Sequence, residues 1–164
     1  MASGDTLQVF YSCDMGSYVT PAYTARHFTV NDRPVANFFD GGSNGTFGNF
    51  TSVLTRNYGS SGITAYIYYA TSGTTGDIDW GIAFERTGDG LQRVDIDDFA
   101  TQKTSTGNTV PGTAYLADVV SIAFSNSEID GLQAGELFRI QVERLATSTL
   151  TADAYLLAIE LKET

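Results

Sequence analysis

Apolar side chains recur at every second position through most of this chain, and no other feature of the sequence restricts the possible folds as strongly. In the segment ITAYIYYA, Ile63, Ala65 and Ile67 share one parity, and Thr64 and Tyr66 take the other. The alternation continues in four later segments, at 77–86, 115–124, 136–145 and 152–162. Successive side chains of a β-strand point to opposite faces, whereas a helix repeats every 3.6 residues or so. The sequence therefore predicts half-buried β-strands.

Four shorter runs in the first third of the chain, TLQVFY, ARHFTV, PVANFF and FTSVLT, have the same period. Clusters of Gly, Ser, Thr and Asp separate the runs, as turns do. Together the runs give about eight or nine strands, with the spacing of an antiparallel sandwich or barrel. The segment 127–135, SEIDGLQAG, predicts one helical turn closed by a glycine, and we expect no significant helix elsewhere.

The alternation also assigns side chains to the core. Trp80 is in phase with Ile78 and Ile82, so we expect its indole inside rather than free to stack on a sugar ring. In the last strand the inward set is expected to be Tyr155, Leu157, Ile159 and Leu161.

The chain has the length of one domain. Its 164 residues contain no internal repeat and no charged or proline-rich linker, so we expect one β-domain over 1–164. The part from 12 to 60 is rich in Gly, Asn, Tyr and Phe. We expect longer loops and short strands there, forming the interaction end, because loops at the ends of a sandwich commonly carry recognition.

Charge and cysteine content exclude several classes. The net charge of −10 argues against nucleic-acid binding, which needs a basic face. No apolar run approaches the length of about 18 residues needed to cross a bilayer, so no membrane partner is expected. The start, MASGDTLQVFYS, has no secretory signal, and Cys13, the single cysteine, allows no internal disulfide. We therefore expect folding in a cytoplasm without a cofactor.

The surface chemistry suggests an interface. The chain has only two lysines, Lys103 and Lys162, beside nine Tyr, ten Phe and seven Arg. Lys is depleted in interface cores, where Tyr, Phe and Arg are enriched. We favour an interface as the reason, and a compositional bias of the source is the alternative.

Carboxylates form close pairs at Asp77 and Asp79 and at Asp95 and Asp97. Alternation would place each pair on one face of a strand. Such pairs can hold Ca²⁺ or perform acid–base chemistry on a glycoside. No calcium-binding loop motif surrounds them, so we favour a solvated edge and keep the four residues as weak calcium candidates.

No motif indicates covalent catalysis. His27 is the only histidine, and neither it nor Cys13 lies in a nucleophile motif. The glycine-rich segment GGSNGTFG lacks both a lysine and a following helix, so a phosphate cradle is not expected.

Aromatic residues are the best candidates for recognition. Tyr18, Tyr23, Phe47 and Tyr58 lie in or beside glycine-rich segments, and we expect them to be exposed. Tyr66 and Tyr68 share a half-polar face with Thr64. Aromatic side chains in such positions bind carbohydrate or protein, and the sequence does not separate the two.

Three segments carry a resemblance to a known group. They are RNYGSSGITAYIYYATSGTTGDIDWGIAFER at 56–86, DIDDFA at 95–100 and GLQAGELFRIQVERLATSTLTADAYLLAIELKET at 131–164. This pattern is similar to small jelly-roll virion proteins of tailed bacteriophages, of the head decoration (cement), head-fibre or tail-associated kind. Ala152 stands where that pattern has Gly, which should alter one turn. The resemblance implies jelly-roll topology and supplies no catalytic motif.

The resemblance implies a non-enzymatic virion structural protein, most simply a capsid decoration protein. Its partners would be the major capsid protein and copies of itself, with a homotrimer as one arrangement, and it would assemble in the host bacterial cytoplasm. The main alternative is a carbohydrate-binding module, free or carried on a virion, with or without Ca²⁺. A glycoside hydrolase is a further alternative, and it would need two carboxylates about 5 to 9 Å apart in a cleft.

Overall fold

The described residues form ten β-strands and two short 3-10 helices. The computed structural model describes residues 4–16, 24–28, 33–39 and 46–164, with the backbone alone for 24–28. The strands are β1 (Thr6–Tyr11), β2 (Thr24–Phe28), β3 (Arg33–Phe38), β4 (Thr46–Val53), β5 (Ile63–Thr71), β6 (Asp77–Thr87), β7 (Lys103–Thr109), β8 (Asp118–Phe124), β9 (Leu137–Arg144) and β10 (Ala154–Glu163). The 3-10 helices are η1 (Ser12–Asp14) and η2 (Asn126–Ile129).

The predicted all-β class is confirmed, and no α-helix occurs in the described part of the chain. The helical turn expected within 127–135 is η2. One strand escaped prediction because β7, KTSTGNT, is polar throughout and shows no alternation. Within the same residues no helix is long and apolar enough to cross a bilayer.

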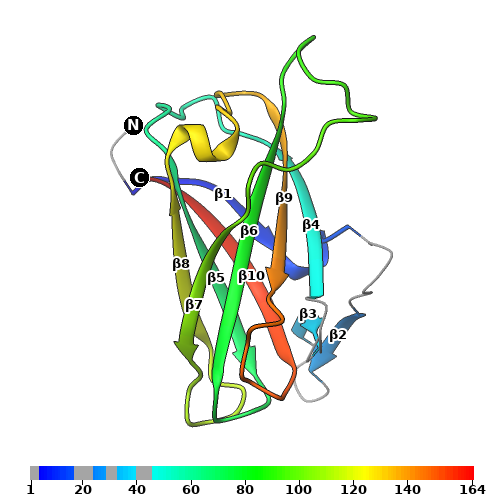
Figure 1. The fold of residues 1–164 in the computed structure, drawn as a ribbon, viewed down its shortest axis with the longest axis vertical. Coiled ribbons are helices and arrows are strands. Elements are labelled where there is room, and N and C mark those ends of the chain that lie inside the picture. The colour runs from blue at the N-terminus through cyan, green and yellow to red at the C-terminus, as the bar shows by residue number, and fades with distance from the viewer. Residues whose placement is uncertain (1–3, 17–23, 29–32, 40–45) are drawn as a thin grey trace.

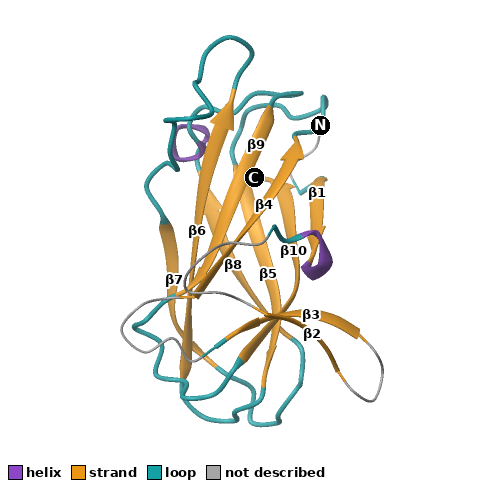
Figure 2. Ribbon diagram, turned by 90° about the vertical axis from the view of Figure 1, so that its right-hand side faces the viewer, coloured by secondary structure: helices purple, strands orange, loops and turns teal. Residues whose placement is uncertain are grey.

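The strands form two antiparallel sheets, which Figures 1 and 2 show as stacked layers. The six-stranded sheet has the order β2-β3-β10-β5-β8, and β1 also pairs with β10. β10 is therefore central: β5 lies along one side of it, and β3 and β1 follow one another along the other side. The four-stranded sheet has the order β4-β9-β6-β7.

The core between the sheets is apolar and aromatic. Trp80 has no exposed surface, as expected, and its indole lies edge-on to Phe38 at 5.3 Å between ring centroids. Phe84 and Phe124 form a second edge-on pair across the two sheets at 5.0 Å. Such pairs add about 0.5–1.5 kcal/mol each to the burial of their area, so they hold the layers together.

The last strand departs from its predicted alternation. The register between β10 and β5 shifts between Leu156 and Ala158, where β10 has a bulge. A bulge inserts one extra residue and reverses the phase of the strand. Leu156, Ile159 and Leu161 are buried, whereas Tyr155 is half-buried on the outer face. The prediction that Tyr155 and Leu157 point inward is therefore wrong, while the prediction for Ile159 and Leu161 is confirmed.

The end of the long segment 88–102 between β6 and β7 runs beside β6, and its side chains Phe99 and Gln102 cover the outer face of β6 and β9. The backbone N–H of Ala100 donates to the carbonyl of Phe84 at 2.7 Å. A Cβ at Gly81 would lie 2.6 Å from the amide carbon of Gln102, so glycine leaves the room that this side chain fills. As a result β6 is buried on both faces over most of its length.

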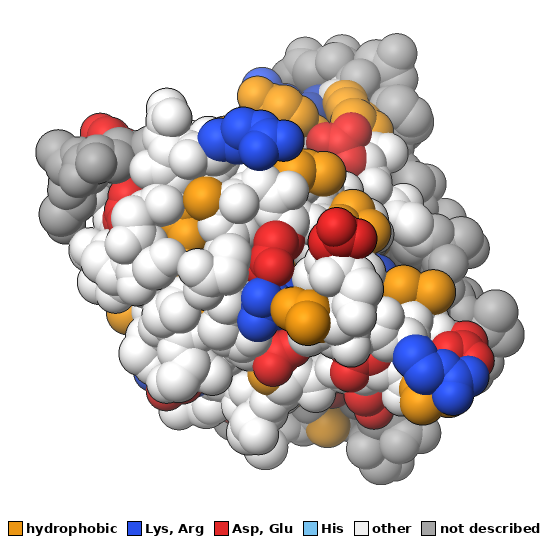
Figure 3. Space-filling model, turned by 90° about the horizontal axis from the view of Figure 1, so that it is seen from above, with side chains coloured by type: hydrophobic (Ala, Val, Ile, Leu, Met, Phe, Trp, Pro, Cys, Tyr) orange, Lys and Arg blue, Asp and Glu red, His pale blue; other side chains and the backbone are white. Residues whose placement is uncertain are grey.

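The outer part of this segment projects beyond the end of the sandwich where the two chain ends lie (Figure 1). Seen from above, that end carries acidic and basic side chains close together between small apolar patches (Figure 3). Asp95 and Asp97 lie in this irregular segment and not in a strand, so the expected sharing of a strand face does not apply to them.

Candidate functional site

The tyrosines of the described residues divide between the core and one surface. Tyr58 and Tyr69 are buried. All other described tyrosines lie on the outer face of the six-stranded sheet, and we call this surface the tyrosine face: Tyr11, Tyr66, Tyr68, Tyr115 and Tyr155. Tyr11 and Tyr115 are more than half exposed, at 58% and 57%.

Strand register brings these residues together from distant parts of the sequence. Ala158 of β10 is opposite Tyr11 on one side and Tyr68 on the other. Directly opposite residues of antiparallel strands share a face. Because adjacent strands are about 4.8 Å apart, Tyr11 and Tyr68 stand roughly 10 Å apart on either side of a small residue. The small Ala158 keeps the surface between the two rings low.

Glu160 is the polar centre of the tyrosine face. The Thr6 hydroxyl donates to its Oε1 at 2.6 Å, and the Tyr68 hydroxyl donates to its Oε2 at 3.0 Å. The ammonium of Lys162 lies 3.6 Å from Oε1 and 5.3 Å from the centre of the Tyr66 ring. One carboxylate therefore fixes the orientation of a tyrosine, a threonine and a lysine.

These contacts change the acidity of both partners. Burial raises the pKa of Glu160, but the hydrogen bonds from Thr6 and Tyr68 and the charge of Lys162 outweigh it, so the pKa is lowered overall. The hydrogen bond to Glu160 raises the pKa of Tyr68, and burial and nearby charge add to the rise. At neutral pH the site thus presents a carboxylate and a neutral phenol.

A shallow pocket of about 310 Å³ adjoins the tyrosine face at its β1–β3 edge. Its lining residues are Tyr11, Ser12, Cys13, Arg33, Pro34, Leu157 and Ala158. The Ser12 hydroxyl donates to the Pro34 carbonyl at 2.9 Å and fixes η1 against β3. The pocket therefore has a rigid base and a mainly apolar lining beside an exposed tyrosine.

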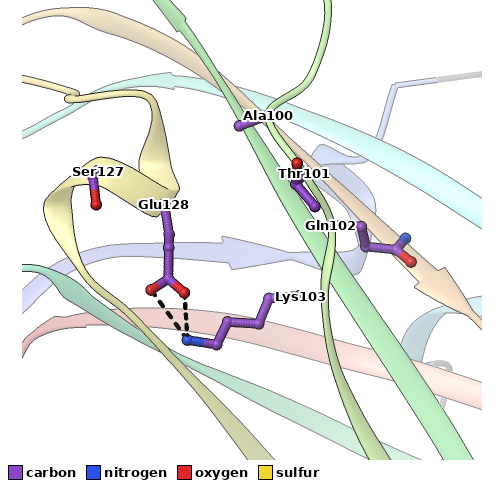
Figure 4. Close-up of a pocket in the computed structure, with 6 residues that line it drawn as sticks. All are labelled: Ala100, Thr101, Gln102, Lys103, Ser127 and Glu128. Carbon is purple, nitrogen blue, oxygen red and sulfur yellow. Dashed lines mark hydrogen bonds and ion pairs between the residues drawn. The ribbon is translucent and has the colours of Figure 1, made fainter.

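A second pocket, of about 320 Å³, opens at the β7 edge of the sandwich (Figure 4). The close-up shows Lys103 and Glu128 pointing toward one another, with the ammonium 2.9 Å from one carboxylate oxygen. The pKa of Glu128 is lowered to about 2 by the backbone and hydroxyl of Ser125 and by Lys103. Because these contacts are the cap of η2 and its tie to β7, we assign this ion pair a structural role.

The structure separates the predicted aromatic residues. Tyr66 and Tyr68 lie together on the tyrosine face. Phe47 is opposite Glu143 on β9, half-buried on the outer face of the other sheet. Tyr58 is 5% exposed and its hydroxyl donates to Asn126 Oδ1, so the expectation that it is exposed is wrong. Tyr18 and Tyr23 lie outside the described residues.

The four weak calcium candidates do not converge. Asp79 is buried and accepts hydrogen bonds from the Gly107 N–H and the Thr147 hydroxyl, both at 2.6 Å. Asp77 accepts from the Thr109 hydroxyl at 2.8 Å. Among the described residues no three His, Cys, Asp or Glu side chains are grouped to hold a metal ion.

Asp95 and Asp97 belong to the projecting segment. Asp95 pairs with Arg93 at 2.7 Å, and both side chains are well exposed. Asp97 is half-buried two residues further on. Asp79 thus has a structural role, because its hydrogen bonds join β6 to Gly107 and Thr147. Asp95 has a solvated position.

Sequence reasoning missed three tyrosines and the carboxylate of the site. Tyr155 was hidden by the β10 bulge, for which the Leu156–Leu157 doublet was the available signal. Tyr115 opens an alternating segment but lies in the loop before β8, and Tyr11 is the last residue of β1, so alternation alone did not place either ring on this face. Glu160 is in phase with outward positions, but only the strand register shows that it meets Tyr66, Tyr68 and Thr6.

Comparison with known proteins gives the class of fold. No protein-family model matches the chain, and no curated protein matches it in sequence. Solved structures do match. The isomalto-dextranase of Arthrobacter globiformis T6, complexed with panose, superposes with a TM-score of 0.55 at 13% identity, over 93% of this chain and 22% of that one. The chain thus matches about a fifth of that enzyme's length.

Two separate modules match over nearly their whole length. The C-terminal CBM6 of LamC, a marine laminarinase from Zobellia galactanivorans, gives a TM-score of 0.51 at 10% identity, over 97% of this chain and 100% of that one. The CBM22-1 xylan-binding domain of Paenibacillus barcinonensis Xyn10C gives 0.50 at 12% identity, over 99% and 96%. The fold is therefore a jelly-roll sandwich of the kind found in carbohydrate-binding modules. Of the resemblance to phage virion proteins, these likenesses support the jelly-roll fold and nothing further.

Proposed function

We propose that this protein binds glycans non-catalytically and holds a polysaccharide on the tyrosine face. The observation that carries the proposal is the segregation of the described tyrosines: those outside the core all lie on one outer face. Chance scattering would also have placed tyrosines on the outer face of the four-stranded sheet. A surface of this kind is a binding surface, since exposed aromatic side chains cost solvation unless something covers them.

The chemistry of the face suits a sugar chain. A tyrosine ring offers a flat apolar surface to the C–H side of a sugar ring, and its hydroxyl stays available for polar contacts. Glu160 and Lys162 add an acceptor and a donor close to Tyr66 and Tyr68. Because Thr6, Tyr68 and Lys162 already orient Glu160, little conformational freedom is lost when a ligand arrives.

Binding fits this face better than hydrolysis. Glycoside hydrolysis uses two carboxylates flanking one bond. Along the described strands β5, β8 and β10, Glu160 is the only carboxylate in an outward-facing position, and it is engaged by Thr6, Tyr68 and Lys162. The fold likeness to carbohydrate-binding modules supports the same reading.

A polysaccharide panel tests the proposal. The neighbours' names suggest laminarin, xylan and dextran as probes. We expect the wild-type protein to be retarded by at least one of them in affinity electrophoresis. The double variant Tyr66→Ala/Tyr68→Ala should bind at least tenfold more weakly, because each stacked ring contributes on the order of 1 kcal/mol.

Phe47→Ala is the matched control, because it removes a half-buried aromatic side chain from the opposite outer face. It should leave glycan affinity unchanged. Equal loss of affinity in the control and the double variant would contradict the assignment of the site. If the wild type binds no polysaccharide but self-associates through Tyr66 and Tyr68, the face is a protein interface and the proposal is wrong.

A further inference from the structure

One residue of the tyrosine face has an unusual backbone conformation. Tyr115 has φ +63°, in the left-handed region. Two other described residues besides glycine share it, Ser60 and Asp130. Asp130 closes η2, a position where aspartate is well tolerated, and serine is small. A bulky aromatic residue in this region is a genuine outlier, because its Cβ crowds the backbone.

The contacts of Tyr115 show how the conformation is held. Its backbone N–H donates to the carbonyl of Thr71 at 2.8 Å, which fixes the segment before β8 to the end of β5. Its ring centre lies 5.9 Å from that of Tyr155, with 38° between the planes. The pair is open to solvent on the side of Tyr115, which is 57% exposed.

Core packing does not explain this arrangement. A strained residue persists when its surroundings fix it, and strain of this kind clusters at functional sites. Tyr115 is more than half exposed, and the neighbouring Leu116 is 55% exposed. Glycine or asparagine would adopt the same backbone at lower cost. The strained backbone therefore serves to place an aromatic ring on the surface.

The position of the pair continues the row of aromatic rings along β5. Tyr66 and Tyr68 point outward two residues apart, and Tyr155 is opposite Ala70, the next outward position. Two residues of a strand advance about 7 Å, so the row from Tyr66 to the level of Tyr155 is roughly 14 Å long. Tyr115 lies beyond it, against Tyr155.

We infer that Tyr115 and Tyr155 form the outermost sugar subsite of this row, and that the ligand is an extended, uncharged polysaccharide lying along β5. The inference rests on the glycan-binding function proposed above. A row of this length needs a chain of several sugar units rather than one sugar. A net charge of −10 and the carboxylate of Glu160 disfavour acidic glycans.

A length series of oligosaccharides tests the inference. Laminari-, xylo- and isomalto-oligosaccharides, from disaccharide to hexasaccharide, are titrated calorimetrically into the full chain. We expect wild-type affinity to rise with length until the row is filled. In Tyr115→Gly the gain in affinity from the last sugar units should be lost, so the longest ligand should bind about tenfold more weakly than it binds the wild type. The shortest ligand that binds should keep its wild-type affinity.

Stability separates a binding role from a structural one. Because Tyr115→Gly relieves the left-handed strain, its unfolding temperature should equal or exceed that of the wild type. Tyr115→Phe keeps the ring and should keep the affinity for long ligands. A fall in unfolding temperature with unchanged affinity for the longest ligand overturns the subsite and assigns Tyr115 a structural role.

The experiments distinguish a failure of the glycan-binding proposal from a failure of the subsite inference. If Tyr66→Ala/Tyr68→Ala abolishes binding and Tyr115→Gly behaves as wild type at every length, the face binds glycans but the subsite is wrong. If the wild type binds none of the oligosaccharides, both proposals are wrong. Acidic oligosaccharides are tested as polygalacturonate fragments. If they bind more tightly, only the inference that the ligand is uncharged is wrong.

Discussion

The two outer faces of the sandwich start from the same strand alternation but carry different side chains. On the four-stranded sheet, the side chains of Phe99 and Gln102 cover the outer face of β6 and β9, and Phe99 lies under the guanidinium of Arg139 at 5.0 Å. The outer face of the six-stranded sheet carries tyrosines, of which Tyr11 and Tyr115 are more than half exposed. Among the described residues, the tyrosines outside the core therefore belong to one outer face, although both sheets share the same alternation.

The two faces also use their charges differently. On the covered face, Arg139 Nε donates to Glu85 Oε2 at 2.8 Å, and Glu85 is 2% exposed. On the tyrosine face, Glu160 is shared among a lysine and two hydroxyls and stays within reach of solvent. The first arrangement contributes to stability, and the second leaves polar atoms for a ligand.

Removing the cation from the covered face should have the largest effect. Arg139→Ala leaves the buried carboxylate of Glu85 without its partner, which costs about 3 kcal/mol. We expect an unfolding temperature about 6–12 °C lower by calorimetry, since 1 kcal/mol shifts a domain of this size by about 2–4 °C. Glycan affinity should not change.

Arg93→Ala is the matched control, because its pair with Asp95 is exposed on both sides. Its effect should stay below about 0.5 kcal/mol. Equal effects of the two variants would mean that the cover does not exclude water from Glu85.

Loosening the cover itself should have the next largest effect. Phe99→Ala removes the ring beneath Arg139 and should cost about 1–2 kcal/mol in urea unfolding, because Phe99 is only half-buried. Hydrogen exchange at Ala100 N–H, bonded to Phe84, should accelerate before that of the core strands. Unchanged exchange there would show that the backbone contacts alone hold the segment.

Removing one hydroxyl from the tyrosine face should have a smaller effect, seen in binding. Tyr68→Phe keeps the ring but deletes the hydrogen bond to Glu160, which contributes about 1 kcal/mol to orienting the carboxylate. We expect about three- to fivefold weaker glycan binding by calorimetry, with the unfolding temperature nearly unchanged. Full retention of glycan affinity would mean that stacking on the ring, and not the hydroxyl, accounts for the contribution of Tyr68 to binding.

The pH dependence of stability should give the smallest effect. The pKa of Glu160 is lower in the folded protein than in the unfolded chain. Its ionised carboxylate therefore stabilises the fold at pH values above the unfolded-state pKa. This stabilisation is lost as the pH falls through the folded-state pKa. At neutral pH the free energy of unfolding of the wild type should exceed that of Glu160→Gln by less than about 1 kcal/mol. The gap should close in acid, as the pH falls below the ordinary pKa of glutamate, about 4.3, and through the lowered pKa of Glu160. A gap independent of pH would mean that charge is not the cause.

Local alternation was sufficient to predict the fold class, because burial of one face dictates the period of each strand. It correctly placed Trp80 in the core and Tyr66 and Tyr68 on an outer face. It failed at β7, where polar residues fill an edge strand, and at Tyr155, where a bulge reverses the phase. The site was harder to predict, since Tyr11, Tyr68 and Glu160 meet only through strand register, and register depends on the whole sheet.

The central place of β10 has a consequence for how the chain acquires its shape. β10 pairs with β1, β3 and β5, and the contact between Thr6 and Glu160 joins residues 154 positions apart. Without β10 the larger sheet is in three unjoined parts, which are β2 with β3, β5 with β8, and β1 alone, so the sheet cannot form before this strand is available. Closing loops of that length makes folding slow. The tyrosine face therefore assembles only when β10 joins these parts of the sheet.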